Sequence, residues 1–152
     1  MKSLRILPFL AVAVLFAFPA PAADFGVRAG RLSDLEESFV GAEVLIDLGA
    51  INLNPNIEYF LIDDITEGTA NLDVTFDIIQ AGKVKPYAGA GLGLLYVDTD
   101  FGDNTDVVGN LIGGITFDLD SVQPYAQIKY FRTLEDDDGD NDEVAFTVGL
   151  RF

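Results

Sequence analysis

Residues 144–152 read Val-Ala-Phe-Thr-Val-Gly-Leu-Arg-Phe. Every second residue of this stretch is a large apolar one, and the residues between them are small, polar or charged. Alternation with a period of two is typical of a β-strand that has one apolar face. Residues 40–48, 53–61 and 70–78 repeat the pattern, with Asn, Asp, Glu or Thr at most of the positions between the apolar ones. The four segments predict an all-β protein.

Four looser segments complete the set, at 25–32, 84–97, 106–117 and 122–133, and no helical periodicity of useful length interrupts them. Short connections alternate with longer acidic ones, so the sequence predicts that all the long connections lie at one end of an antiparallel meander. An open sheet of eight strands would expose two edges and aggregate. We therefore expect closure into an eight-stranded antiparallel up-and-down barrel.

The first 23 residues have the pattern of a cleaved signal peptide. Lys2 and Arg5 give a positive start, residues 6–18 are almost wholly apolar, and small residues follow at 20–23. A membrane anchor is the alternative, but an apolar run of about 13 residues is short against the roughly 20 of a spanning helix. We expect cleavage after Ala22 or Ala23, which leaves residues 24–152 as the barrel domain.

The composition excludes several function classes. The chain has 9 basic and 25 acidic residues, a formal net charge of −16, and no His or Cys. Nucleic acid is a poor partner for such a surface. Disulfides, Cys/His zinc sites, cysteine nucleophiles and imidazole-based triads are excluded by the missing residue types. We expect no enzyme activity, no cofactor and no bound metal ion, although an aspartate-pair hydrolase is not excluded by composition.

The apolar face could point either way in an eight-stranded barrel. A soluble lipocalin-like carrier would turn it inward, and a membrane barrel would turn it toward lipid. The interior of eight strands is narrow, so a uniform Val, Leu, Ile and Phe set would overfill it, whereas the Gly, Asn and Thr of the opposite face fit. Each stripe also corresponds to about ten residues of tilted strand, the thickness of a hydrocarbon layer. The sequence favours the transmembrane β-barrel.

The final strand resembles the C-terminal sorting strand of bacterial outer-membrane β-barrels, in which a terminal Phe follows apolar residues at every second position. The matching residues are Val144, Phe146, Val148, Leu150 and Phe152. Residues 24–152 as a whole resemble the small barrels of the OmpA/OmpX-like superfamily (the outer membrane protein beta-barrel domain of the porin family). The resemblance implies a Gram-negative outer membrane, periplasmic termini and short turns, extracellular long loops, and insertion by the barrel-assembly machinery. It also implies contact with outer-membrane lipid and lipopolysaccharide, and we expect a monomer.

Charged residues on the polar face are predicted to line the lumen. They are Arg28, Glu43, Glu58, Asp73, Asp77, Lys129 and Arg151. Buried charges must be paired or hydrated, so we expect a cluster of Glu43, Glu58 and Asp73 neutralised by Arg28 and Lys129. Glycines of segment 84–97 are expected to leave room for Arg28. A structural plug is the favoured role of these charges, and a gated cation path is the alternative.

Two further groups of residues are candidates for surface roles. An aromatic girdle is predicted at each membrane boundary, formed by Tyr59, Tyr96 and Tyr130 toward the loops and by Phe25, Phe117 and Phe152 toward the turns. The acidic stretch 135–143 suggests weak cation binding by Asp136, Asp138, Asp140 and Asp142. Its spacing does not fit an EF-hand, and a solvated, mutually repelling loop is the favoured interpretation.

Two functions remain open at this point. The first is an outer-membrane barrel with a structural or surface-interaction role, a plugged polar lumen and acidic extracellular loops. The second is a narrow porin-like barrel that passes small ions or molecules. Steady single-channel conductance would separate the second function from the first.

Overall fold

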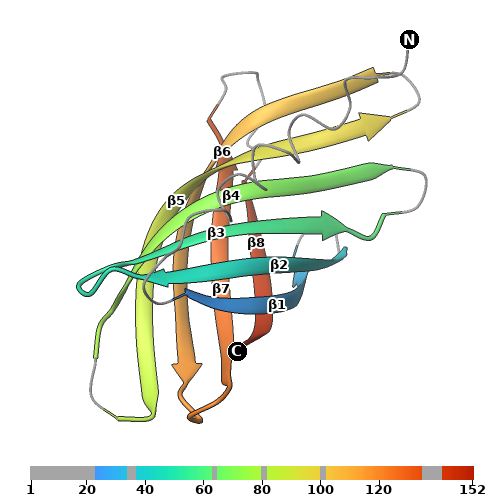
Figure 1. Ribbon diagram of the computed structural model, residues 1–152. Coiled ribbons are helices and arrows are strands. Elements are labelled where there is room, and N and C mark those ends of the chain that lie inside the picture. The colour runs from blue at the N-terminus through green and yellow to red at the C-terminus, as the bar shows by residue number, and fades with distance from the viewer. Residues whose placement is uncertain (1–22, 34–36, 63–64, 80–81, 100–101, 135–141) are drawn as a thin grey trace.

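The computed structural model describes residues 23–33, 37–62, 65–79, 82–99, 102–134 and 142–152. These residues form a closed barrel in which eight antiparallel strands follow one another in chain order (Figure 1). The predicted fold class is confirmed. The strands are β1 (Ala23–Leu32), β2 (Ser38–Asp47), β3 (Asn52–Phe60), β4 (Thr66–Asp77), β5 (Val84–Thr99), β6 (Gly102–Phe117), β7 (Gln123–Thr133) and β8 (Asp142–Arg151). The predicted signal peptide lies outside the described residues apart from Ala23.

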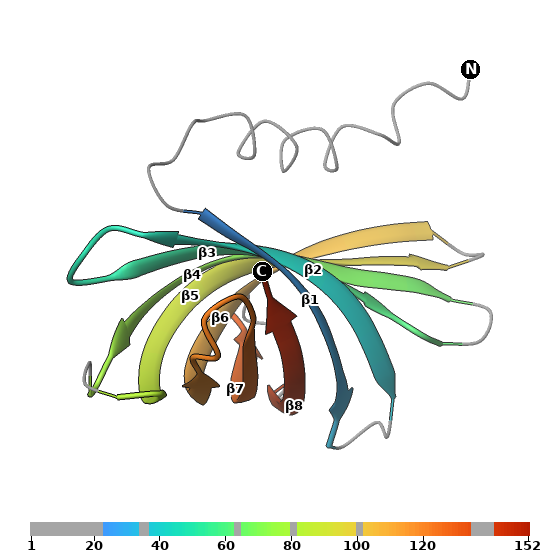
Figure 2. The same ribbon diagram turned by 60° about the horizontal axis from the view of Figure 1, so that its bottom comes forward.

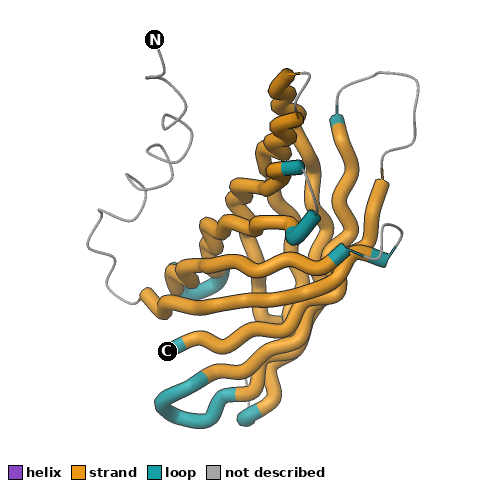
Figure 3. The backbone as a smooth tube through the Cα atoms, turned by 90° about the vertical axis from the view of Figure 1, so that its right-hand side faces the viewer, coloured by secondary structure: helices purple, strands orange, loops and turns teal. Residues whose placement is uncertain are grey.

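Strands β1 and β8 close the barrel. Their register pairs Gly26 with Arg151, and Phe25 and Phe152 exchange two backbone hydrogen bonds of 3.1 and 2.8 Å. The described backbone consists of strands joined by turns and loops (Figure 3). Within it, no helix has the length and apolar character needed to cross a membrane. Because the barrel is closed, each described strand has a hydrogen-bonded neighbour on both sides, and the sheet has no free edge.

The strands are staggered around the barrel. Following register partners from Ala23 once around the wall leads back to β1 at Ser33, a shift of ten residues. A stagger of this size in an eight-stranded barrel tilts the strands by about 40° from the axis. At this tilt, strands of about ten residues are matched to a hydrocarbon layer.

The period-two alternation sorts side chains between the two faces of the wall. Large apolar residues point outward, and their exposed fractions reach 54% at Phe25, 60% at Leu92 and 63% at Val148. The buried polar and charged residues occupy the opposite parity, with Glu43 at 2%, Arg28 at 3% and Lys129 at 1% exposure. A barrel with this arrangement has an apolar exterior and a polar interior, the reverse of a soluble carrier.

The short turns use the conformations expected of tight hairpins. Gly49 in the β2–β3 turn has φ +93°, a value that suits glycine, and its N–H donates to Asp47 Oδ1 over 2.7 Å. Asp120 in the β6–β7 turn has φ 66°, in the left-handed region that Asp tolerates better than most residues. The turns bring successive strands back without interrupting the ladder.

One of the expected long acidic connections, residues 98–105 between the predicted strands 84–97 and 106–117, is wrong for most of its length. Strands β5 and β6 continue through it as a hairpin and pair Asp98 with Asp103 and Thr99 with Gly102. Each of these two strands has 16 residues, longer than any other strand (Figure 1). Acidic side chains do not prevent backbone pairing when both faces of the ribbon are exposed to water, so charge was a poor guide to the strand end. The connection between the predicted strands 53–61 and 70–78 is also shorter than expected, because β4 begins at Thr66.

Candidate functional site: the barrel lumen

Five charged side chains form a continuous ladder inside the barrel. Arg151 Nε lies 2.8 Å from Glu43 Oε1, and Lys129 Nζ lies 2.8 Å from Glu58 Oε1. Arg28 stands between the two carboxylates, with Nη1 3.6 Å from Glu43 Oε2 and Nη2 3.4 Å from Glu58 Oε1. The order Arg151–Glu43–Arg28–Glu58–Lys129 therefore alternates in sign. Opposite charges at these distances offset the cost of removing both from water.

The ladder joins strands that are not neighbours. Glu58 projects from β3 and Lys129 from β7, so their ion pair crosses the lumen. Arg28 on β1 and Glu43 on β2 lie in adjacent strands, whereas Arg151 comes from β8. The Nε, Nη1 and Nη2 atoms of Arg28 are buried and lack a hydrogen-bond partner. The position of Arg28 is therefore set by charge attraction more than by directed hydrogen bonds.

Asp73 is not a member of the ladder. The prediction that Glu43, Glu58 and Asp73 form one cluster neutralised by Arg28 and Lys129 is therefore wrong for Asp73. Asn56 Nδ2 donates to Asp73 Oδ2 over 2.8 Å, and Asn110 Nδ2 donates to Asp73 Oδ1 over 2.9 Å. Among the described residues, no cation lies within ion-pair distance of this carboxylate. Asn71 extends the amide network to Asn56 and Thr69. Amide donors thus satisfy Asp73 where we expected Arg28 and Lys129.

The glycines of β5 make room for this amide network and not for Arg28. A Cβ built on Gly91 would overlap Asp73 Oδ1, and one built on Gly93 would overlap Asn71 Oδ1. Arg28 is accommodated by Gly41 of the neighbouring strand β2, where a Cβ would lie 3.1 Å from Arg28 Cγ. The residue type that creates the space was predicted correctly, but the side chain that fills it was not.

Two tyrosines fill the lumen toward the turns. The guanidinium carbon of Arg151 lies 4.0 Å from the ring centroid of Tyr125 and 6.0 Å from that of Tyr87, which is a cation–π arrangement. Tyr87 OH donates to Gln127 Oε1 over 3.0 Å. The rings occupy the space over Gly114 and Gly149, where added Cβ atoms would overlap them. The two tyrosines occupy equivalent places in the short repeats Pro86-Tyr87-Ala88 and Pro124-Tyr125-Ala126.

A small cavity opens below the tyrosines at the turn end. It has a volume of about 100 Å³. Asp77 is half-buried there and, among the described residues, forms no ion pair with a ladder residue. Asp24, Asp47, Lys85 and Arg151 are among its other lining residues.

An apolar cluster that was not predicted from the sequence lies at the opposite end of the lumen. Leu32, Phe39, Phe60 and Ala145 are almost fully buried, and the rings of Phe39 and Phe60 meet edge to face with centroids 5.8 Å apart. We call these four residues the apolar plug. Their inward parity was the available signal, since Leu32, Phe39 and Phe60 are large apolar residues on the mostly polar face.

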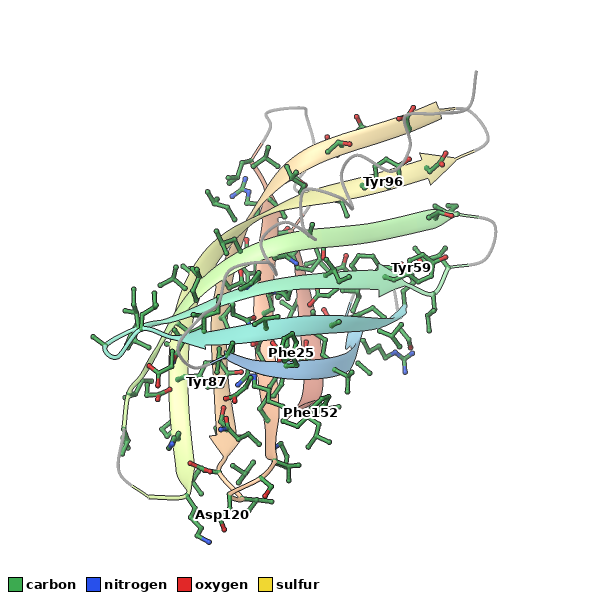
Figure 4. The ribbon with its side chains drawn as sticks, viewed as in Figure 1. Phe25, Tyr59, Tyr87, Tyr96, Asp120 and Phe152 are labelled. Atoms are coloured by element: carbon green, nitrogen blue, oxygen red, sulfur yellow. The ribbon has the colours of Figure 1, made fainter. Side chains whose placement is uncertain are left out.

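The predicted girdle residues lie at the two ends of the outer wall. Phe25, Phe117 and Phe152 are exposed near the turn end, and Tyr59 is exposed near the loop end. Figure 4 shows Tyr59 and Tyr96 well separated from Phe152 along the barrel. Tyr96 and Tyr130 are half-buried. Their hydroxyl groups lie 3.5 Å from Asp98 Oδ2 and 3.3 Å from Asp142 Oδ2 respectively.

The predicted cation loop is described only at Asp142. That carboxylate accepts the hydrogen bond from Tyr130 at the start of β8. Asp136, Asp138 and Asp140 lie outside the described residues. In the part of the chain that is described, no group of three or more Asp, Glu, His or Cys residues could hold a metal ion.

Solved structures share this fold. The chain is similar to the Neisserial surface protein A, NspA, with a TM-score of 0.68 and 16% sequence identity over 85% of this chain and 94% of that one. It is also similar to the N-terminal β-barrel domain of Pseudomonas aeruginosa OprF, with a TM-score of 0.72 and 16% identity over 86% and 95% of the two chains. The sequence matches no protein-family model and no curated protein. The class defined by fold and lumen is thus the small eight-stranded barrel found among bacterial outer-membrane proteins.

Proposed function

We propose that the chain is an integral outer-membrane β-barrel with a structural or surface-interaction role. The observation that carries the proposal is the inverted distribution of polarity. Side chains such as Phe76, Leu92 and Leu111 are about half or more exposed on the outer wall, whereas the charged ladder is sealed inside. In water such an exterior would drive aggregation, and in lipid it is the stable arrangement.

Fractionation of cells that express the full chain, leader included, tests the location. The proposal expects the protein in the outer-membrane fraction. It also expects a folded band that migrates differently from the boiled sample on a denaturing gel. Recovery as a soluble periplasmic protein would overturn the proposal and restore the lipocalin-like alternative.

The side chains that fill the lumen support a scaffold in preference to a pore. The ladder crosses the lumen between β3 and β7, and the apolar plug covers it on the loop side. Eight strands leave little space beyond their own side chains. We infer that the intact barrel is silent in planar bilayers under an applied potential. Steady single-channel steps from the wild-type protein would instead favour the porin-like function.

The extended β5–β6 hairpin is the surface that we assign to external contacts. Asp98, Asp103 and Asp106 give it an acidic character, and Asn104 Nδ2 donates to both carboxylate oxygens of Asp106 over 2.9 and 3.0 Å. Carboxylates at the end of a hairpin suit hydrated divalent cations, such as those among lipopolysaccharide phosphates. Calorimetric titration of calcium into the refolded protein tests the assignment, and heat no greater than the buffer blank would reject it.

A further inference from the structure

We propose that the outer wall made by β6, β7, β8 and β1 binds one phosphate-bearing lipid of the outer leaflet. Its acyl chain would lie in an apolar groove, and its phosphate would contact Arg31. These four strands are consecutive members of the curved wall seen in Figure 2. The inference rests on the proposed membrane location and adds a defined ligand class and binding site to it.

The groove has a volume of about 600 Å³ and follows two neighbouring rows of outward residues across the wall. In the first row, Phe146 of β8 pairs with Arg31 of β1 on one side and with Ile128 of β7 on the other. The register continues this row to Gly113 of β6. The second row, in the same strand order, is Ala29, Val148, Ala126 and Ile115.

Small residues create the depression. Ala29, Ala126 and Gly113 replace the large side chains found at most outward positions of the barrel, and a Cβ built on Gly113 would meet no atom within 4 Å. Phe146 and Val148 rise beside them with exposed fractions of 53% and 63%. The surface is therefore hollow where its neighbours are filled, and an extended acyl chain fits such a channel. Because free lipid tails are as apolar as the groove, selectivity must come from its polar end.

Arg31 supplies that polar end. It is exposed, it points outward, and it is the penultimate residue of β1, close to the loop end of the barrel. The guanidinium group matches a phosphate through paired charge-assisted hydrogen bonds. Arg132 lies on the same wall, two residues beyond the girdle residue Tyr130 on β7, and is also exposed.

The distribution of positive charge supports a phosphate-bearing occupant. The chain has only nine basic residues. Lys2 and Arg5 lie in the predicted leader, three others are buried in the lumen, and Lys83 and Lys85 lie near the turn end. Arg31 and Arg132 are the two that remain, and both lie on the outer wall toward the loop end. An otherwise acidic molecule thus places cations where the phosphates of an outer-leaflet lipid lie.

Native mass spectrometry of the refolded barrel in a neutral detergent tests the proposal. Lipid A is the probe. Dephosphorylated lipid A with the same acyl chains and phosphatidylethanolamine are the comparison lipids. The expected result is one retained lipid A per barrel, with an apparent Kd about tenfold lower than for the dephosphorylated form. Excess inorganic phosphate should not displace it, because the acyl chain contributes to binding; displacement would overturn the lipid assignment.

Two variants examine the two ends of the site. Arg31→Gln should weaken lipid A binding about tenfold, and Ala126→Leu, which fills the groove, should reduce it by a similar factor. The matched controls are Lys83→Gln, a charge loss at the turn end, and Ala70→Leu on the opposite strand β4, and neither should change the Kd. Equal lipid A binding by all four variants would overturn the proposed site. A mass that shows a second copy of the chain in place of lipid A would also overturn it.

The folded band on unboiled gels separates this outcome from failure of the proposed function. Variants that fold and fractionate to the outer membrane but retain no lipid A would reject the lipid site alone. A wild-type chain that forms no heat-modifiable band would reject the membrane barrel itself.

Discussion

Lys129 and Glu58 project from opposite sides of the barrel and meet inside it, with Nζ 2.8 Å from Oε1. Both side chains are almost fully buried, so the pair is shielded from solvent and salt. A contact that joins β3 to β7 links walls that backbone pairing alone connects only through the intervening strands. The ladder therefore fixes the cross-section of the barrel as well as filling it.

Removing one partner of this pair should be more damaging than removing both. Lys129→Met leaves a buried carboxylate without its nearest cation and should lower the unfolding free energy by about 3 kcal/mol. Glu58→Gln in the same background relieves the unpaired charge, so the double variant should recover part of the loss. Urea unfolding followed by the gel-shift assay measures both. Strictly additive losses would show that the two side chains act independently.

Arg28 should be the most sensitive position of the ladder. Arg28→Ala exposes two carboxylates to each other and should destabilise the barrel by about 3–5 kcal/mol. Loss of the folded band at a lower temperature on unboiled gels is the readout. Arg31→Ala, on the outer face of the same strand, is the matched control and should leave the melting temperature nearly unchanged. An unaltered melting temperature for Arg28→Ala would contradict the role of the ladder.

Glycine at position 91 should be required for steric reasons. A Cβ there would overlap Asp73 Oδ1 and lie 2.6 Å from the Leu72 carbonyl oxygen, so Gly91→Ala should cost about 1–3 kcal/mol. Gly113→Ala is the control, because a Cβ at that position points into open space. Comparison of urea midpoints separates steric overlap from the general effect of replacing glycine in a strand. Equal midpoints for the two variants would refute the close approach.

The apolar plug should contribute to both stability and closure. Phe60→Ala removes one ring of the edge-to-face pair with Phe39 and should destabilise the barrel by about 3–5 kcal/mol. It should also admit water to the loop side of the ladder. Planar-bilayer recordings of this variant are expected to show more frequent current events than the wild type. Phe25→Ala, on the outer wall, should leave the recordings silent.

The ion pair at the turn end predicts a pH dependence. The hydrogen bond from Lys85 to Asp118, 2.9 Å long, and the positive charge of Lys85 hold the pKa of Asp118 below its ordinary value of 3.8. A depressed carboxyl pKa stabilises the fold above the unfolded-state pKa, and the contribution disappears as the pH falls through the folded-state pKa. Asp118→Asn should therefore be slightly less stable than wild type at pH 7 and indistinguishable from it well below pH 3.8. Parallel melting curves at both pH values provide the measurement.

Alternation was sufficient to predict the strands and their two faces, and the narrow interior of an eight-stranded barrel then decided which face points outward. Segments such as 70–78 place apolar and polar residues on opposite sides without exception, and a one-residue error in register would have turned the polar set to the outside of the barrel. Strand ends were less predictable. The ladder between β5 and β6 continues into an acidic segment because backbone hydrogen bonds require no particular side chain.

The contacts within the lumen could not be predicted from parity. Parity and strand position place Asp73 close to Glu43 and Glu58, but they do not show which donor reaches each carboxylate. Asn56 and Asn110 reach Asp73 because the stagger of the strands brings their amides level with it. Phe39 and Phe60 were missed because the apolar stripe on the outward parity dominated the pattern. Such cross-lumen contacts depend on three-dimensional closure.

The pairing of β1 with β8 also has a kinetic consequence. Gly26 and Arg151 are register partners although nearly the whole barrel domain separates them along the chain. Joining such distant segments carries a large entropic cost of loop closure, so we expect the β1–β8 pairing to form late in folding. Until then β1 and β8 would each have one unpaired edge, and these edges and the apolar outer surface could bind other unfolded chains. The outer-membrane location that we propose therefore requires that the unfolded chain be kept from aggregating until β1 and β8 pair in the bilayer.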